Sequence, residues 1–149
     1  KPLLIKKPFE YFMTTMITWM GAVLIRTEVL KKLKGFREHL FMSEDGNLFI
    51  RIAFEHDFLF VPDVVLAKRE HDLSLSQSKR APFEWKIKNF KSLLKDPKFK
   101  PHHKIIRKRL KFFYRDNCRF LFKQHQYLSC LKELAWYACF RIQTKLTKS

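Results

Sequence analysis

The chain has 149 residues, of which 46% are hydrophobic and 15% are aromatic, a length and composition that exclude disorder throughout. Its formal net charge is +17 at pH 7, which favours an anionic partner, either nucleic acid or an anionic membrane surface. The three cysteines are odd in number and form no C-x-x-C pair. We therefore predict free thiols in a reducing compartment, with no disulfide framework and no zinc site.

The charge is unevenly distributed along the chain. Residues 1–80 hold 13 Lys and Arg against 10 Asp and Glu, a net charge of +3. Residues 81–149 hold the other 18 basic and 4 acidic residues, a net charge of +14. This contrast predicts two regions, a balanced one over 1–80 and a basic one over 81–149. The longest uncharged stretch, 11–25, has 15 residues, which is fewer than the roughly 20 that a spanning helix needs, so we expect buried core there.

The balanced region predicts a mixture of strands and helices. Residues 18–26 are mostly apolar and predict a buried strand, and residues 28–33 predict a short helix that Gly35 ends in a left-handed conformation. Ser43 predicts the N-cap of a helix over 44–56. Two more short strands are predicted at 58–62 and 64–68, followed by a polar loop over 69–78. Strands mixed with helices in this way predict an α/β arrangement.

The basic region predicts helices only. Apolar residues recur at helical spacing over 83–94, over 103–123 and over 128–142, with a proline-containing break at 96–101. Such stripes are typical of helices that pack on one another. The basic residues between the stripes leave two readings open. The helices form a solvated bundle that caps the first region, or they hold the protein against an anionic membrane.

Two adjacent carboxylates, those of Glu44 and Asp45, fall in the first turn of the helix predicted after Ser43. The helix dipole favours negative charge at this position and tends to keep a carboxylate ionised. A rigidly held, ionised carboxylate is suited to act as a general base or as part of a metal shell. Ordinary helix capping would place acidic residues in the same turn, so the pair alone does not choose between the two readings.

Four motifs in order resemble the C-terminal part of the catalytic domain of family 2 glycosyltransferases, the inverting nucleotide-sugar enzymes of the GT-A fold. They are Trp19-Met20-Gly21-Ala22, then Lys34-Gly35-Phe36, then Glu44-Asp45 with Leu48 and Arg51, and finally Arg69-x-His71-x-x-Ser74-x-Ser76. The resemblance covers about residues 16–78. It implies an α/β fold in which residues 1–80 are the C-terminal half of a GT-A domain, followed by a basic α-helical tail over 81–149.

The resemblance also implies roles for the acidic pair. Asp45 matches the catalytic base, which takes the proton from the acceptor hydroxyl as that oxygen attacks the anomeric carbon. One carboxylate is enough for a single displacement with inversion, whereas a retaining glycosidase needs a second one as nucleophile. Glu44 lies beside the base, where it would orient the acceptor or hold Asp45.

The remaining site residues follow from the same resemblance. His71 matches a ligand of a divalent metal, Mn²⁺ or Mg²⁺, that offsets charge on the departing nucleotide. A solvated histidine in a polar loop is the alternative. Trp19, Gly21 and Ala22 match the wall of the sugar or acceptor pocket, although a tryptophan in a strand is more often part of a core. We expect Arg51 to pair with a carboxylate and the three cysteines to be small buried residues.

The expected partners are a nucleotide-sugar donor, a glycan or lipid-linked acceptor of cell-surface polysaccharide synthesis, and an anionic membrane surface bound by residues 81–149. The expected location is cytoplasmic, peripheral on the inner face of the membrane. Asp-x-Asp, the metal motif of the family's nucleotide-binding half, does not occur in these residues. We therefore expect the chain to be the C-terminal portion of a longer enzyme and to be inactive alone.

Two alternatives come from other functional classes. The basic helices favour a nucleic-acid-binding module, since clustered Lys and Arg with interleaved aromatic residues track phosphates and stack bases. Only charge supports this reading, and it leaves the motifs of the balanced region unexplained. The second alternative is a non-catalytic relative of the glycosyltransferases that serves in interactions.

Overall fold

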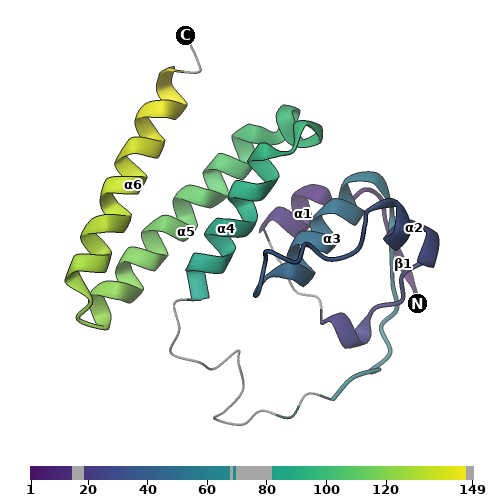
Figure 1. Ribbon diagram of the computed structural model, residues 1–149. Coiled ribbons are helices and arrows are strands. Elements are labelled where there is room, and N and C mark those ends of the chain that lie inside the picture. Colours follow the sequence, from purple (N-terminus) through teal and green to yellow (C-terminus); the bar gives the residue numbers. More distant parts are fainter. Residues whose placement is uncertain (15–18, 68, 70–81, 147–149) are drawn as a thin grey trace. The chain divides into compact units, whose positions relative to one another are not determined.

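A computed structural model describes residues 1–14, 19–67, 69 and 82–146 (Figure 1). The chain divides into two compact units, Lys1–Ser78 and Lys79–Ser149, and each is described by itself below. In the described part of the chain, no helix combines the length and the apolar character needed to cross a bilayer.

The first unit holds one long helix, several short ones and a small sheet. Its elements in chain order are β1 (Leu3–Ile5), α1 (Phe9–Thr14), the 3₁₀ helix η1 (Met20–Ala22), α2 (Thr27–Lys32), α3 (Glu44–Glu55) and β2 (Phe58–Phe60). The core forms where α1 packs against α3. Met13 of α1 and Leu48 of α3 are fully buried, and the rings of Phe12 and Phe49 lie 6.1 Å apart between centroids.

Helix α3 is the best-buried element of this unit. All eight residues from Gly46 to Ala53 are buried, so the helix is held on more than one side. Its apolar content explains this, because most of these positions are Leu, Phe, Ile or Ala. The predicted helix is thus confirmed, and its first turn is anchored to the core of the unit.

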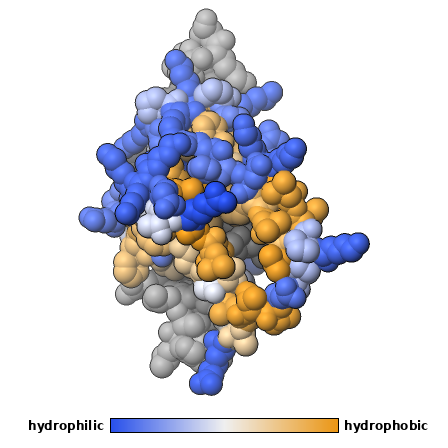
Figure 2. Space-filling view, turned by 90° about the vertical axis from the view of Figure 1, so that its right-hand side faces the viewer, coloured by the Kyte–Doolittle hydropathy of each residue, from blue (hydrophilic) through white to orange (hydrophobic). Residues whose placement is uncertain are grey.

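The only sheet in the described residues is a two-stranded antiparallel ribbon. Leu3 pairs with Phe60, and the neighbouring pairs continue the ladder. Beside the ribbon, the backbone amide of Lys7 donates to Asp57 Oδ1 at 2.9 Å. Large apolar side chains of the ribbon are more than half exposed, namely those of Leu3, Leu4, Leu59 and Phe60. Figure 2 shows the side of the molecule that lies to the right in Figure 1, where hydrophobic residues (orange) gather at the surface.

Two predicted strands are not present. Residues 19–26 contain the 3₁₀ turn η1 and otherwise irregular backbone, and residues 64–67 form no strand. Both segments are apolar, but a short apolar run does not by itself specify a strand, and neither has a pairing partner among the described residues. Leu24 and Val64 are almost fully exposed as a result. The described residues are mostly helical with this one ribbon, and the GT-A assignment stays a prediction.

The second unit is built from three long helices. They are α4 (Pro82–Lys95), α5 (His103–Lys123) and α6 (Tyr127–Leu146), with the 3₁₀ helix η3 (Pro97–His102) between the first two. Helix α5 packs against both α4 and α6 (Figure 1). Phe90 of α4 and Phe113 of α5 are buried with their ring centroids 5.0 Å apart. The three predicted helices are confirmed.

The cysteines differ from one another in exposure. Cys118 on α5 and Cys130 on α6 are buried, and the Cys130 thiol donates to the backbone oxygen of Cys118 at 3.5 Å. Burial raises the pKa of the Cys118 thiol to about 11. Both residues confirm the prediction of small buried side chains. For Cys139 the prediction is wrong, because it lies on the exposed side of α6.

Two helices end in the same way. The amide of Lys34 donates to the oxygen of Lys31, and the amide of Gly35 donates to that of Leu30, the pair of bonds that defines a Schellman motif after α2. Lys34 and Gly35 both have positive φ, at 57° and 60°, which confirms the left-handed ending predicted for Gly35. Helix α5 ends in the same motif with His125 in the left-handed conformation, at φ 57°.

Candidate active site in the first unit

Glu44 and Asp45 occupy the first turn of α3, as predicted. Both side chains are half-buried. One oxygen of Asp45 accepts a hydrogen bond from the amide of Gly46 at 2.6 Å. Oε2 of Glu44 is buried and has no hydrogen-bond partner among the described residues. A buried carboxylate oxygen is normally hydrogen-bonded. Among the described residues of the first unit, this oxygen and Nε2 of His56 are both buried without a partner.

Ser43 precedes this turn but does not cap it as predicted. It stands at the N-cap position with φ 68°, in the left-handed region, and its side chain makes no capping hydrogen bond. Capping by a serine requires an extended backbone that directs the hydroxyl toward the second or third amide of the helix, and the left-handed backbone prevents this. Asp45 instead accepts from an amide of the first turn.

Arg51 of α3 anchors the start of the loop that leads to Glu44 and Asp45. Its side chain is buried and donates to the backbone oxygens of Leu33, at 2.6 Å, and Gly35, and to Oδ1 of Asn47 at 2.8 Å. These acceptors are two carbonyl oxygens and one amide oxygen, and the expected pairing with a carboxylate stays a prediction. The guanidinium binds carbonyl groups that the end of α2 leaves unpaired. This ties the end of α2 to α3 and defines where the loop toward Glu44 begins.

The three predicted pocket residues lie in or beside η1. Trp19 is about half exposed, so it is not a core residue. Gly21 and Ala22 are also exposed, and a side chain added at Gly21 would meet Leu66 Cδ1 at 3.4 Å. The contact partner of Gly21 is thus the segment that follows β2. A common pocket of these three residues with Glu44 and Asp45 stays a prediction.

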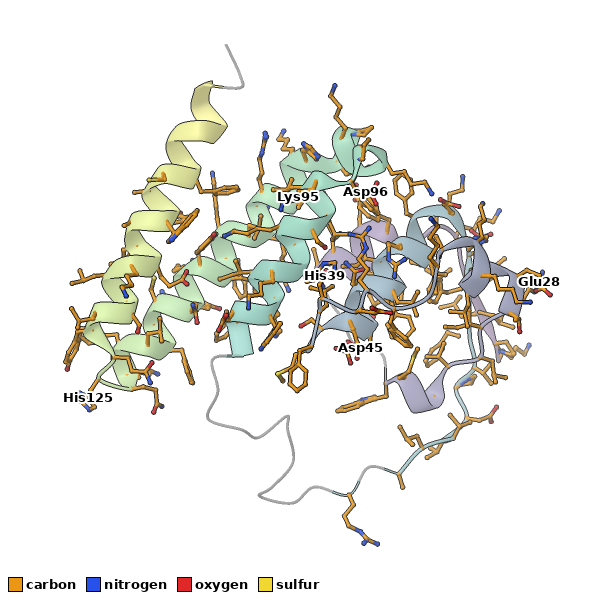
Figure 3. The ribbon with its side chains drawn as sticks, in the orientation of Figure 1. Glu28, His39, Asp45, Lys95, Asp96 and His125 are labelled. Atoms are coloured by element: carbon orange, nitrogen blue, oxygen red, sulfur yellow. The ribbon has the colours of Figure 1, made fainter. Side chains whose placement is uncertain are left out.

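The predicted metal ligand, His71, lies outside the described residues. Within the described ranges, no group of three His, Cys, Asp or Glu residues could hold a metal ion. Figure 3 shows Asp45 at the end of α3 and Glu28 on the far side of the first unit, on α2, so that Glu28 does not join the acidic pair. The structure therefore brings Glu44 and Asp45 together by adjacency and leaves the link to His71 untested.

A second polar cluster, which the sequence analysis missed, lies in the second unit. Tyr114 and Asn117 of α5 and Glu133 of α6 each bury an oxygen with no hydrogen-bond partner among the described residues. Burial raises the pKa of Glu133 and raises that of Tyr114 to about 12, whereas Lys91 on α4 opposes the shift at Glu133. The sequence contains one indication of this cluster, because Glu133 is one of only 4 acidic residues in the basic region, 81–149.

Comparison of the chain with protein-family models, with curated proteins and with solved structures found no match. The resemblance to family 2 glycosyltransferases thus rests on the motifs of the chain itself.

Proposed function

We propose that this chain is part of an inverting glycosyltransferase that transfers a sugar from a nucleotide-diphospho-sugar to a glycan or lipid-linked acceptor, with Asp45 as the general base. The observation that carries the proposal is the half-buried acidic pair in the first turn of α3, with one buried Glu44 oxygen that has no partner among the described residues. Plain helix capping would not require that oxygen to be buried and unpaired.

The surroundings of Asp45 suit a general base. The helix start supplies a dipole that favours the ionised carboxylate, and the burial of α3 from Gly46 to Ala53 holds the backbone of the turn in place. One oxygen of Asp45 is engaged by the Gly46 amide, which leaves the other to accept the proton of an acceptor hydroxyl. The neighbouring Glu44 would accept a hydrogen bond from the same acceptor through its unpaired oxygen.

The proposal includes a divalent metal, Mn²⁺ or Mg²⁺, with His71 as one of its ligands. Such a metal supplies Lewis-acid stabilisation of the departing nucleoside diphosphate. The donor, its nucleotide-binding residues and the other metal ligands are not among the motifs of this chain. We accordingly propose that the 149 residues alone do not complete the transfer.

The test is a transfer assay on the 149-residue chain and on the complete product of its gene, with a panel of nucleotide-sugars and Mn²⁺. We expect transfer by the complete product, no transfer by the 149 residues, and loss of transfer on chelation of the metal. The substitution Asp45→Asn should lower kcat by about 10²–10⁴-fold, because removal of a general base costs that much. The matched control is Asp57→Asn, which alters an exposed carboxylate of the same unit.

The outcomes separate the parts of the proposal. An unchanged kcat in Asp45→Asn would remove Asp45 from the chemistry. Transfer by the 149 residues alone would show that no further residues are needed. If the complete product transfers no sugar from any donor, the transferase proposal is wrong and the non-catalytic alternative replaces it.

A further inference from the structure

Helix α6 has an exposed apolar face that the second unit does not cover. Its buried side, including Cys130 and the partly buried Glu133 and Tyr137, packs toward α5. A neighbouring side of the helix carries residues three or four apart, which line up on one face. We call this the apolar face; it consists of Tyr127, Leu128, Leu131, Leu134, Ala135 and Ala138, all exposed. Leu128 and Leu131 are 78% and 62% exposed.

The exposed side of α5 is basic. We define the basic stripe as Lys104, Lys108, Lys111, Arg115 and Arg119, which follow one another at spacings of three or four residues and are all exposed. Asp116 lies 3.5 Å from both Arg115 and Arg119. One carboxylate cannot neutralise two guanidinium groups, and the three lysines add further positive charge, so the stripe keeps a net positive charge. The stripe spans 119 − 104 = 15 residues, about 22 Å of helix.

Phe122 joins the basic stripe to the apolar face. It lies three residues after Arg119, on the same exposed side of α5, and is 61% exposed. Its ring centroid lies 5.5 Å from that of Tyr127, the first residue of the apolar face, in an edge-to-face contact. The tight turn at Gln124–Gln126 holds the two rings together. Apolar and cationic surface are therefore continuous at this end of the unit.

We propose that the α5–α6 hairpin binds an anionic lipid bilayer, with the apolar face in the headgroup region and the basic stripe against the lipid phosphates. A leucine-rich exposed helix face beside Lys and Arg is the composition of an interfacial helix. Tyr127, which is 50% exposed on α6, suits the same boundary because it has an apolar ring and a polar hydroxyl group.

The positive charge of residues 81–149, together with the apolar face, favours an anionic bilayer over a second copy of the chain or a nucleic acid. A second copy of the chain would bring another +14 region against the first, which like charges oppose. Nucleic acid would use the basic stripe but gives the leucines no apolar partner. An anionic bilayer satisfies both surfaces at once. This inference does not rest on the proposed transferase activity, since bilayer binding does not involve Asp45.

The experiment uses the full 149-residue chain with two kinds of vesicle, one of phosphatidylcholine alone and one containing phosphatidylglycerol. Cys139 is exposed on α6 while Cys118 and Cys130 are buried, so an environment-sensitive dye on Cys139 reports contact. We expect a blue shift and sedimentation with the anionic vesicles only. The double variant Leu128→Gln/Leu131→Gln should weaken this partition by on the order of tenfold or more.

Two controls make the result specific. Leu24→Gln changes a fully exposed leucine of the first unit and should leave partition unchanged. Lys108→Gln/Lys111→Gln should weaken partition by about fivefold for each lysine, whereas Lys31→Gln, on α2, should have no comparable effect. Circular dichroism of each variant establishes that its helices are intact.

Three outcomes would overturn the proposal. Equal binding by wild type and Leu128→Gln/Leu131→Gln would mean non-specific charge attraction. Self-association that the leucine variant abolishes, without vesicle binding, would assign the face to a second copy. Binding to single-stranded DNA that displaces the chain from vesicles, and that the leucine variant retains, would assign the basic stripe to nucleic acid.

Discussion

Arg51 and Glu133 show two different ways of burying a charged side chain. Arg51 is surrounded by three acceptors, and hydrogen bonds to a charged group are worth about 1.5–3 kcal/mol each. Its burial is therefore compensated. Glu133 has one buried oxygen without a partner among the described residues, and burial raises its pKa. The fold favours the protonated form of this carboxyl group.

The raised pKa of Glu133 predicts a pH dependence of stability. Lys91 and Glu84 on α4 act on this carboxyl in opposite senses, and burial is the largest cause of the shift. As the pH rises from the ordinary value of 4.5 toward the raised one, the unfolded carboxyl ionises first. The unfolding free energy contributed by Glu133 therefore falls over this window and stays low above it.

Replacing Glu133 with Gln should remove this pH-dependent loss of unfolding free energy. We expect Glu133→Gln to unfold at a higher urea concentration than wild type at pH 7, with the difference disappearing below pH 4.5. Urea titrations followed by circular dichroism at several pH values measure this. Glu28→Gln, on exposed α2, is the matched control. If both variants behave alike, the burial of Glu133 does not control the stability of the second unit.

At the scale of the elements, two glycine substitutions near the end of α2 should change the unfolding free energy in opposite directions. Lys34 is left-handed at φ 57°, a conformation that glycine adopts at no steric cost. Lys34→Gly should therefore raise the unfolding free energy by about 0.5–1 kcal/mol. Lys31→Gly, three residues earlier and inside α2, should lower it by about 1 kcal/mol, because glycine is a poor helix former. Urea unfolding of both variants measures the two changes. Changes of the same sign would contradict the left-handed assignment.

The elements that the sequence predicted well are those with long amphipathic repeats. The apolar spacing over α5 and the buried run of α3 specify helices without reference to the rest of the chain. The strand predicted over 18–26 failed because an apolar run becomes a strand only when another strand pairs with it. The cap at Ser43 failed because the sequence does not reveal a left-handed backbone.

The candidate site was predictable in part for the same reason. Glu44 and Asp45 are adjacent in sequence, so their placement on one helix turn needed only a helix start. The link between Asp45 and His71 depends on contacts between distant segments, which no local pattern specifies. Glu133 was missed because its burial depends on how α6 packs against α5.

At the scale of the whole molecule, the two units differ in which segments of the chain they bring together. β1 pairs with β2 across 60 − 3 = 57 residues, and α1 packs on α3. In the second unit each long helix packs on the next one in the chain. The ribbon between β1 and β2 is thus the most distant pairing among the described residues of the first unit.

That ribbon sets an order of folding. Distant pairings form slowly because the intervening chain must first lose its freedom, whereas consecutive helices associate quickly. We expect the second unit to refold first after dilution from urea, although it comes later in the chain. Pulsed hydrogen exchange would show its helix amides protected before those of the first unit, and the reverse order would contradict this. During synthesis, β1 has no partner until Phe60 has been added. Its exposed leucines are then the part of the nascent chain most in need of a chaperone.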